Sequence, residues 1–149
     1  MILLRTITTF LALLAPAYGY DLNSSGGWSV DISAANLINY AGSNLEPELE
    51  SASGVSNLSV TNGSGGWTVS MRKSGGHSNV RIFVKRTSGG IGNGNISGGT
   101  AYLELTGSNT VFFTGTQNKT GISLQYKLTG LSIDIPPAVY LSSITFTVQ

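Results

Sequence analysis

The chain has 149 residues, of which 10% are charged, and its formal net charge at pH 7 is +1. It contains no cysteine, which excludes disulfide bridges, thiol nucleophiles and thiolate metal sites. Gly, Ser, Thr and Asn are abundant while good helix formers are scarce, which argues against a helical domain. Stability must therefore come from packing and hydrogen bonds, alone or with a neighbouring subunit.

Residues 1–19 have the organisation of a secretory signal peptide. Arg5 supplies the positive charge of the amino-terminal region, an apolar run follows, and Ala17 and Gly19 fit the small-residue positions of a cleavage site. The apolar run is much shorter than the about 20 residues that cross a bilayer. We therefore expect an exported protein, secreted or held at the cell surface, whose mature chain of residues 20–149 is one domain without membrane insertion.

The phrase Gly-Gly-Trp occurs twice, ending at Trp28 and Trp67, and alternating apolar and polar residues follow each copy. In the first copy Trp28, Val30 and Ile32 would share one face of a strand over residues 28–33. One interpretation places both tryptophans in the core at equivalent strand starts. The other treats residues 28–33 as an assembly strand that is added to the sheet edge of a neighbouring copy, with Trp28, Val30 and Ile32 as its anchors.

Between the predicted strands, the sequence indicates one short helical segment, one turn and one long loop. Beyond the signal segment, residues 33–42 carry the only helical spacing, enough for one or two short turns. The sequence SGGHSN at 74–79 predicts a hairpin between the strands on either side of it, and residues 88–99 form a longer Gly-rich loop.

Alternation is clearest in the carboxy-terminal part, at residues 122–128, 131–135 and 140–148. Such segments are typical of antiparallel strands with one packed face and one wet face. About eight to ten short strands, spaced by turns roughly every ten residues, indicate a sandwich or a barrel. We therefore predict an all-β fold, a single immunoglobulin-like antiparallel β-sandwich.

The charged residues are distributed unevenly along the mature chain. Residues 20–70 contain five acids and no base, whereas residues 71–149 contain seven bases and two acids. This asymmetry at near-zero net charge favours self-association through complementary patches, unless the fold interleaves the two regions. The basic stretch 72–86 has a single aromatic residue, Phe83, which together with the export signal argues against nucleic acid as a partner.

No set of residues with catalytic or metal-binding spacing emerges. His77 is the only histidine, it lies in a Gly-rich turn, and no Gly-x-Ser-x-Gly motif accompanies it. The acids of residues 46–50 surround Pro47 and are typical of an exposed loop. We expect neither an enzyme nor a cofactor or metal site.

The segment IPPAVYLSSITFTV at residues 135–148 resembles the closing segment of secreted bacterial β-sandwich subunits of the fimbrial and spore-coat-protein-U-like group. The chain lacks the disulfide that many fimbrial subunits carry and the aromatic ending of chaperone-dependent pilins. The resemblance implies a structural or adhesive subunit of a surface appendage or coat, which associates with copies of itself or with related subunits by lending a strand. The matching positions are Pro136, Pro137, Tyr140, Ile144, Phe146 and Val148.

A small exported sandwich also fits a second class, the carbohydrate-binding modules. In these domains exposed aromatic rings stack on sugar rings, and Tyr40, Trp67 and Tyr102 are the candidates here. The two classes differ in what they require of the tryptophans, because a stacking residue must be exposed and a core residue must not.

Overall fold

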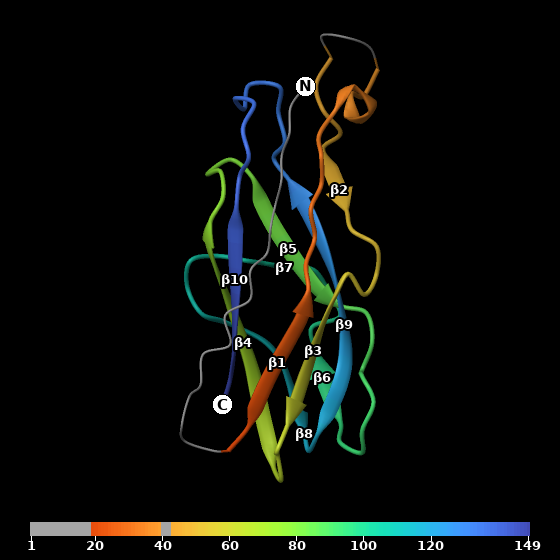
Figure 1. The fold of residues 1–149 in the computed structure, drawn as a ribbon, viewed down its shortest axis with the longest axis vertical. Helices are drawn as coiled ribbons and strands as arrows, with labels where there is room; N and C mark the ends of the chain where they lie inside the picture. The colour runs from red at the N-terminus through yellow and green to blue at the C-terminus, as the bar shows by residue number, and fades with distance from the viewer. Residues whose placement is uncertain (1–18, 40–42) are drawn as a thin grey trace.

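The computed structural model describes residues 19–39 and 43–149. The signal segment predicted at 1–19 lies outside the described residues except for Gly19, and Tyr40 lies outside them as well. The chain forms two antiparallel sheets that pack face to face around one apolar core (Figure 1). The predicted all-β sandwich is therefore confirmed.

The first sheet has the strand order β1-β3-β9-β5-β7, and β2 pairs with the end of β9 beyond β3. The second sheet has the order β10-β4-β8-β6. The strands of the first sheet are β1 (Asp21–Gly26), β2 (Glu48–Glu50), β3 (Ser56–Thr61), β5 (Arg81–Arg86), β7 (Leu103–Glu104) and β9 (Lys119–Thr129). Those of the second sheet are β4 (Gly66–Gly75), β6 (Ile96–Gly98), β8 (Thr110–Thr116) and β10 (Ser142–Val148).

The topology matches an immunoglobulin sandwich in part: the first sheet and the β4–β10 pair follow its order, whereas β8 and β6 extend the second sheet differently, and among the described strands none lies beyond β10. The order β1-β3-β9-β5 corresponds to the A-B-E-D sheet of an immunoglobulin domain, and β10 lies beside β4 as strand F lies beside strand C. From β3 to β10 every successive strand lies in the other sheet, so each connection in this part of the chain crosses between the sheets. These crossings hold the two sheets together around the core.

The period of two predicted the apolar faces of β9 and β10 correctly. Every second residue of β9 from Ile122 to Leu128 is buried, and β10 buries Ile144, Phe146 and Val148. Trp67 opens β4 with only 3% of its surface exposed, so it is the core residue that one interpretation expected. Trp28 is half-buried and packs against the same core, but it does not begin a strand.

The strand predicted at residues 28–33 is not formed. The first described strand is β1, which pairs with β3 along all six of its residues and ends where Gly26 lies opposite Ser56, the first residue of β3. The β1–β3 ladder therefore ends before Trp28, because β3 has no further residue to pair with it. Residues 28–32 still alternate between packed and exposed positions, which shows that apolar alternation can persist without a hydrogen-bonded neighbour.

Two other local expectations are corrected. Residues 74–79 are not a hairpin, because β4 and β5 belong to different sheets. Residues 131–135 form a turn instead of a strand, since the hydroxyl of Ser132 bonds to the backbone N–H and carboxylate of Asp134 and competes with a ladder. In the described part of residues 33–42, the helical spacing corresponds to a 3₁₀ turn, Ala34–Asn36, capped by Ser33.

One buried polar pair joins β3 and β9, two strands of the first sheet that are far apart in the sequence. The hydroxyls of Tyr126 on β9 and Ser56 on β3 are 2.7 Å apart, and both residues are almost fully buried.

We expect Tyr126→Phe to destabilise the protein by about 1–3 kcal/mol, because it leaves the buried hydroxyl of Ser56 without a partner. The double variant Tyr126→Phe/Ser56→Ala should cost less than the sum of the single variants in chemical denaturation. Additive costs would contradict this coupling.

The same tyrosine predicts loss of stability in alkali. Burial raises the pKa of the Tyr126 hydroxyl to about 12, above its ordinary value of about 10. Between these values the folded state keeps a proton that the unfolded state has released, so the free energy of unfolding falls as the pH rises from about 10 to about 12. Tyr126→Phe should flatten this fall in denaturant titrations at increasing pH. Part of the slope remains, because burial also raises the pKa of Tyr102 to about 12. An unchanged slope in the variant would contradict the assignment.

Candidate functional site

The edges of the sandwich are unequal in length. Within the described residues, β6 and β7 end their sheets with three and two residues, whereas β1 and β10 end them with six and seven. Short edges offer little backbone to another chain, but long ones are templates for strand addition. The two long edges contact each other, so they lie on the same side of the sandwich.

The register of β10 determines which of its backbone groups face outward. Gln149 exchanges both backbone hydrogen bonds with Thr68 of the β4 side, at 3.1 and 2.7 Å. Hydrogen-bonded and non-hydrogen-bonded pairs alternate in an antiparallel ladder. The backbone groups of Thr147, Thr145 and Ser143 therefore point toward β4. Those of Ile144 and Val148 point away from it, toward the outer side of the sheet.

The composition of β10 does not protect this edge. The strand SSITFTV contains no charged residue and no proline, the two features with which sheet proteins commonly block edge pairing. Directly before it, Val139 and Leu141 are 50% and 53% exposed. The edge is therefore uncharged and adjoins apolar surface that another chain could cover.

The carboxy-terminal residues that carry the fimbrial resemblance form one structural unit with this edge. Ile144, Phe146 and Val148 anchor β10 in the core, where the Phe146 ring stacks on Phe112 with centroids 6.3 Å apart. Tyr140 lies in the loop before the strand and donates its hydroxyl to the carbonyl of Pro136 at 2.8 Å. Pro137 is exposed in the same loop.

The anchors of the predicted assembly strand lie elsewhere. Trp28 and Val30 are half-buried and Ile32 is 1% exposed, and all three pack against the core of their own chain. Sequence reasoning missed β1, because Asp21–Gly26 contains a single large apolar residue, Leu22, and so carries no alternation.

The structure brings no aromatic platform together from the residues proposed for sugar stacking. Trp67 is buried, donates its indole N–H to the carbonyl of Gln117 at 2.7 Å and packs edge-on against Phe113, so the stacking role predicted for it is wrong. The Tyr102 ring is half-buried, with the ammonium groups of Lys85 and Lys127 at 4.4 and 5.0 Å from its centroid. Tyr40 lies outside the described residues.

The fold brings some acids of the first half of the chain beside bases of the second. The Glu48 carboxylate lies 3.1 Å from the ammonium of Lys127, across the β2–β9 pair. On the other side of β5, Arg81 pairs with Glu104 through two hydrogen bonds. The charge asymmetry of the sequence is therefore partly cancelled in three dimensions.

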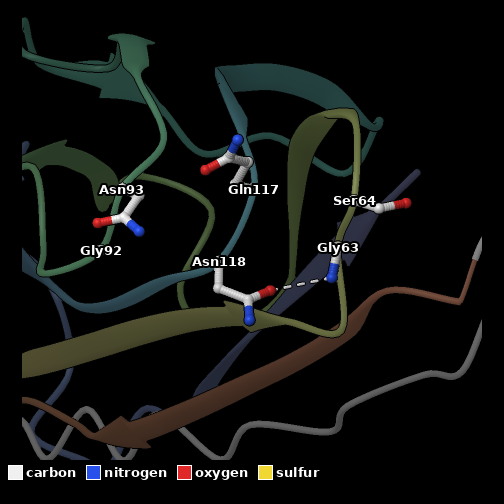
Figure 2. A pocket seen from close by; sticks show the side chains of 6 residues that line it. All are labelled: Gly63, Ser64, Gly92, Asn93, Gln117 and Asn118. Carbon is white, nitrogen blue, oxygen red and sulfur yellow. Dashed lines mark hydrogen bonds between the residues drawn. The ribbon is translucent and has the colours of Figure 1, made fainter.

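A polar hollow opens at the end of the sandwich where β3 turns into β4 and β8 turns into β9 (Figure 2). Its volume is about 480 Å³. Sequence reasoning treated its residues only as turn and loop signals. The available hint was the amide side chains of the Gly-rich loop at 88–99 and of the turn at residues 117–118. The lining residues are Gly63, Ser64, Gly92, Asn93, Gln117 and Asn118.

The remaining chemistry of the described residues is sparse. They contain no group of three or more His, Cys, Asp or Glu side chains that could hold a metal ion. His77 accepts a hydrogen bond from the backbone of Asn79 at 3.2 Å and packs its ring against Tyr140. No helix in the described part of the chain is long and apolar enough to cross a membrane.

Comparisons of the chain with protein-family models, with curated proteins and with solved structures gave no match. The resemblance to fimbrial and coat-protein subunits therefore stays a prediction based on residues 135–148.

The direction of the β10 backbone predicts an alternating pattern of hydrogen exchange. In dilute protein the amides of Ile144 and Val148 should exchange faster than those of Ser143, Thr145 and Thr147, which point toward β4. Amide exchange followed by NMR at single-residue resolution measures this. Equal protection along the whole strand would contradict an open edge, because it would require a second partner for β10.

Proposed function

We propose that this chain is an exported structural or adhesive subunit of a bacterial surface appendage or coat, without catalysis or cofactor. Copies associate by pairing strands at the side of the sandwich where β1 and β10 lie. The observation that carries the proposal is the long, uncharged edge of β10, beside a second long edge and opposite two short ones. The signal-like residues 1–19 support export.

The magnitude of backbone pairing indicates what else such an interface needs. The four outward groups of Ile144 and Val148 would contribute roughly 2–6 kcal/mol at about 0.5–1.5 kcal/mol each. Association costs roughly 4–15 kcal/mol in lost freedom of motion. Strand addition alone therefore does not hold two copies together. The exposed Val139 and Leu141 adjoin the edge and would supply the apolar contact that the balance requires.

The symmetry of the contact distinguishes an appendage from a simple dimer. A β10 edge paired with the β10 edge of a second copy closes a two-fold dimer, and growth then stops. A β10 edge paired with the β1 edge of the next copy is heterologous and continues as a filament. The proposed function requires the second arrangement. In this arrangement the copies pair through edge strands that are already formed. The assembly strand predicted at residues 28–33 therefore need not leave the core of its own chain.

Lysines on the wet face of β10 test the proposal. We expect Ser143→Lys/Thr147→Lys to abolish multimers, because charge at a sheet edge opposes pairing. Both positions lie opposite serines of β4, Ser74 and Ser70, so no like charge is placed directly across the ladder. Size-exclusion chromatography and negative-stain microscopy measure the assembly, and circular dichroism checks the fold.

The control is Thr114→Lys, which adds a lysine to an exposed position of β8, an interior strand of the same sheet. It should assemble like the unaltered protein. A protein that stays monomeric at all concentrations, or a double lysine variant that still forms filaments, would refute assembly through this edge. Closed dimers that the lysines disrupt would support the edge and refute the appendage.

A further inference from the structure

The polar hollow is built from three connections that are far apart in the sequence. Gly63 and Ser64 come from the β3–β4 turn, Gly92 and Asn93 from the β5–β6 loop, and Gln117 and Asn118 from the β8–β9 turn. These connections meet at the lower end of the sandwich in Figure 1. Figure 2 shows the amide side chains of Asn93, Gln117 and Asn118 arranged around the shared space. Ligand sites on sandwiches commonly lie at such loop-bearing ends.

Hydrogen bonds tie the three connections to one another and to the core. The Asn118 side-chain oxygen accepts from the backbone N–H of Gly63 at 3.0 Å. The buried Trp67 indole holds the carbonyl of Gln117 at 2.7 Å, and the nearly buried ammonium of Lys119 holds the carbonyl of Gly92 at 3.0 Å. The shape of the hollow is therefore set before any ligand arrives, which lowers the ordering cost of binding.

Backbone strain concentrates at this place. Among the described residues, Asn62 and Gln117 are the two non-glycine residues with positive φ, at 58° and 55°. Glutamine has no special tolerance for this conformation, which is unfavourable for residues with a Cβ atom. The Gln117 N–H donates to the carbonyl of Gly65 at 3.0 Å, so the turn is held by the β3–β4 turn across from it. Strain that the surroundings maintain is a common property of functional sites.

The amide side chains of the lining have hydrogen-bond donors and acceptors that are not used by the described part of the chain. The side chains of Asn93 and Gln117 make no hydrogen bond to any described residue, and the Asn118 amide uses only its oxygen. Each amide presents both donors and an acceptor. None of the six lining residues is charged. The hollow therefore suits a ligand that is neutral and that donates and accepts hydrogen bonds at several points.

These requirements select one class of ligand. An apolar group would leave the amides desolvated without partners, and an ion would find no opposite charge in the lining. An extended peptide is recognised along a strand edge or a groove, whereas this hollow is an open depression bordered by three turns. Hydroxyl groups of a neutral sugar both donate and accept, which matches the amides.

We propose that the hollow lined by Asn93, Gln117 and Asn118 binds a neutral saccharide unit. The site is separate from the β10 edge and does not depend on assembly. It uses none of the aromatic residues that the sequence suggested for sugar stacking. Without an aromatic platform the affinity of one site is expected in the millimolar range, and several copies in one assembly would raise it through avidity.

Ligand-observed saturation-transfer NMR tests the proposal on protein purified after expression of the full chain, because the method tolerates assemblies. The probes are D-mannose, D-galactose and N-acetyl-D-glucosamine, with N-acetylneuraminic acid and the capped peptide acetyl-Ser-Ala-Ser-amide as comparators. We expect saturable transfer to at least one neutral sugar and weaker transfer to both comparators. No transfer to any neutral sugar, or stronger transfer to a comparator, would overturn the proposal.

The variant Asn93→Ala/Gln117→Gly locates the binding. Glycine suits the positive φ at position 117 and keeps the backbone bonds to Trp67 and Gly65. We expect sugar affinity to fall about tenfold or more, because two side-chain hydrogen bonds are lost. Asn109→Ala removes an exposed amide from the β7–β8 loop and should leave the affinity unchanged.

If the double variant unfolds, Asn93→Ala alone should still weaken binding about threefold, since its side chain bonds to no described residue and its loss leaves the fold intact. Unchanged affinity in a folded hollow variant would overturn the proposal, as would an equal loss in Asn109→Ala.

Discussion

The pairing of β9 with its neighbours is the constraint on which the rest of the sandwich depends. This strand lies between β3 and β5 and also carries β2, so three segments of the first sheet take their register from it. Its alternate side chains from Ile122 to Leu128 form the centre of the core. With no disulfide in the chain, this ladder and the packing beneath it hold the sheets in place. The buried pair of Tyr126 and Ser56 fixes the register further, because a slip would strand two hydroxyls in an apolar core.

The core-facing residues of β9 and β10 were predictable from the sequence, and residues whose place depends on a distant partner were not. The alternation at 122–128 and 140–148 identified β9 and β10, because both have one packed and one wet face. The same alternation at residues 28–32 marked packing alone, since β3 begins at Ser56 and leaves no ladder there. The turn signal at 74–79 showed that the chain reverses, but the sheet to which the next strand belongs is a non-local property. The hollow could not be predicted from the sequence for the same reason, because its three connections come together only in the folded chain.

Edge geometry links the fold to the proposed assembly. Along an antiparallel edge strand, every second residue buries its side chain, and every second residue points its backbone groups away from the neighbouring strand. The register decides whether one residue does both. The two backbone hydrogen bonds between Gln149 and Thr68 set the register of β10, so that its core-facing residues are also those with outward backbone groups. Ile144 and Val148 thus anchor the strand in the core and also present their backbone to the open side. The rigid part of the strand is therefore the part offered to a partner, which lowers the ordering cost of pairing.

The separation of the two candidate surfaces has a mechanical consequence. Assembly through the β1 and β10 edges extends sheets sideways, whereas the hollow lies among turns at one end of the strands. Pairing along one side therefore does not require the turns to move, and Trp67 and Lys119 hold them from within the same chain. A filament built in this way would display one hollow per copy at a regular spacing. Weak sites repeated on a rigid array bind a repetitive surface far more tightly than one site does, so a modest polar hollow is sufficient for adhesion in an assembled protein and insufficient in a monomer.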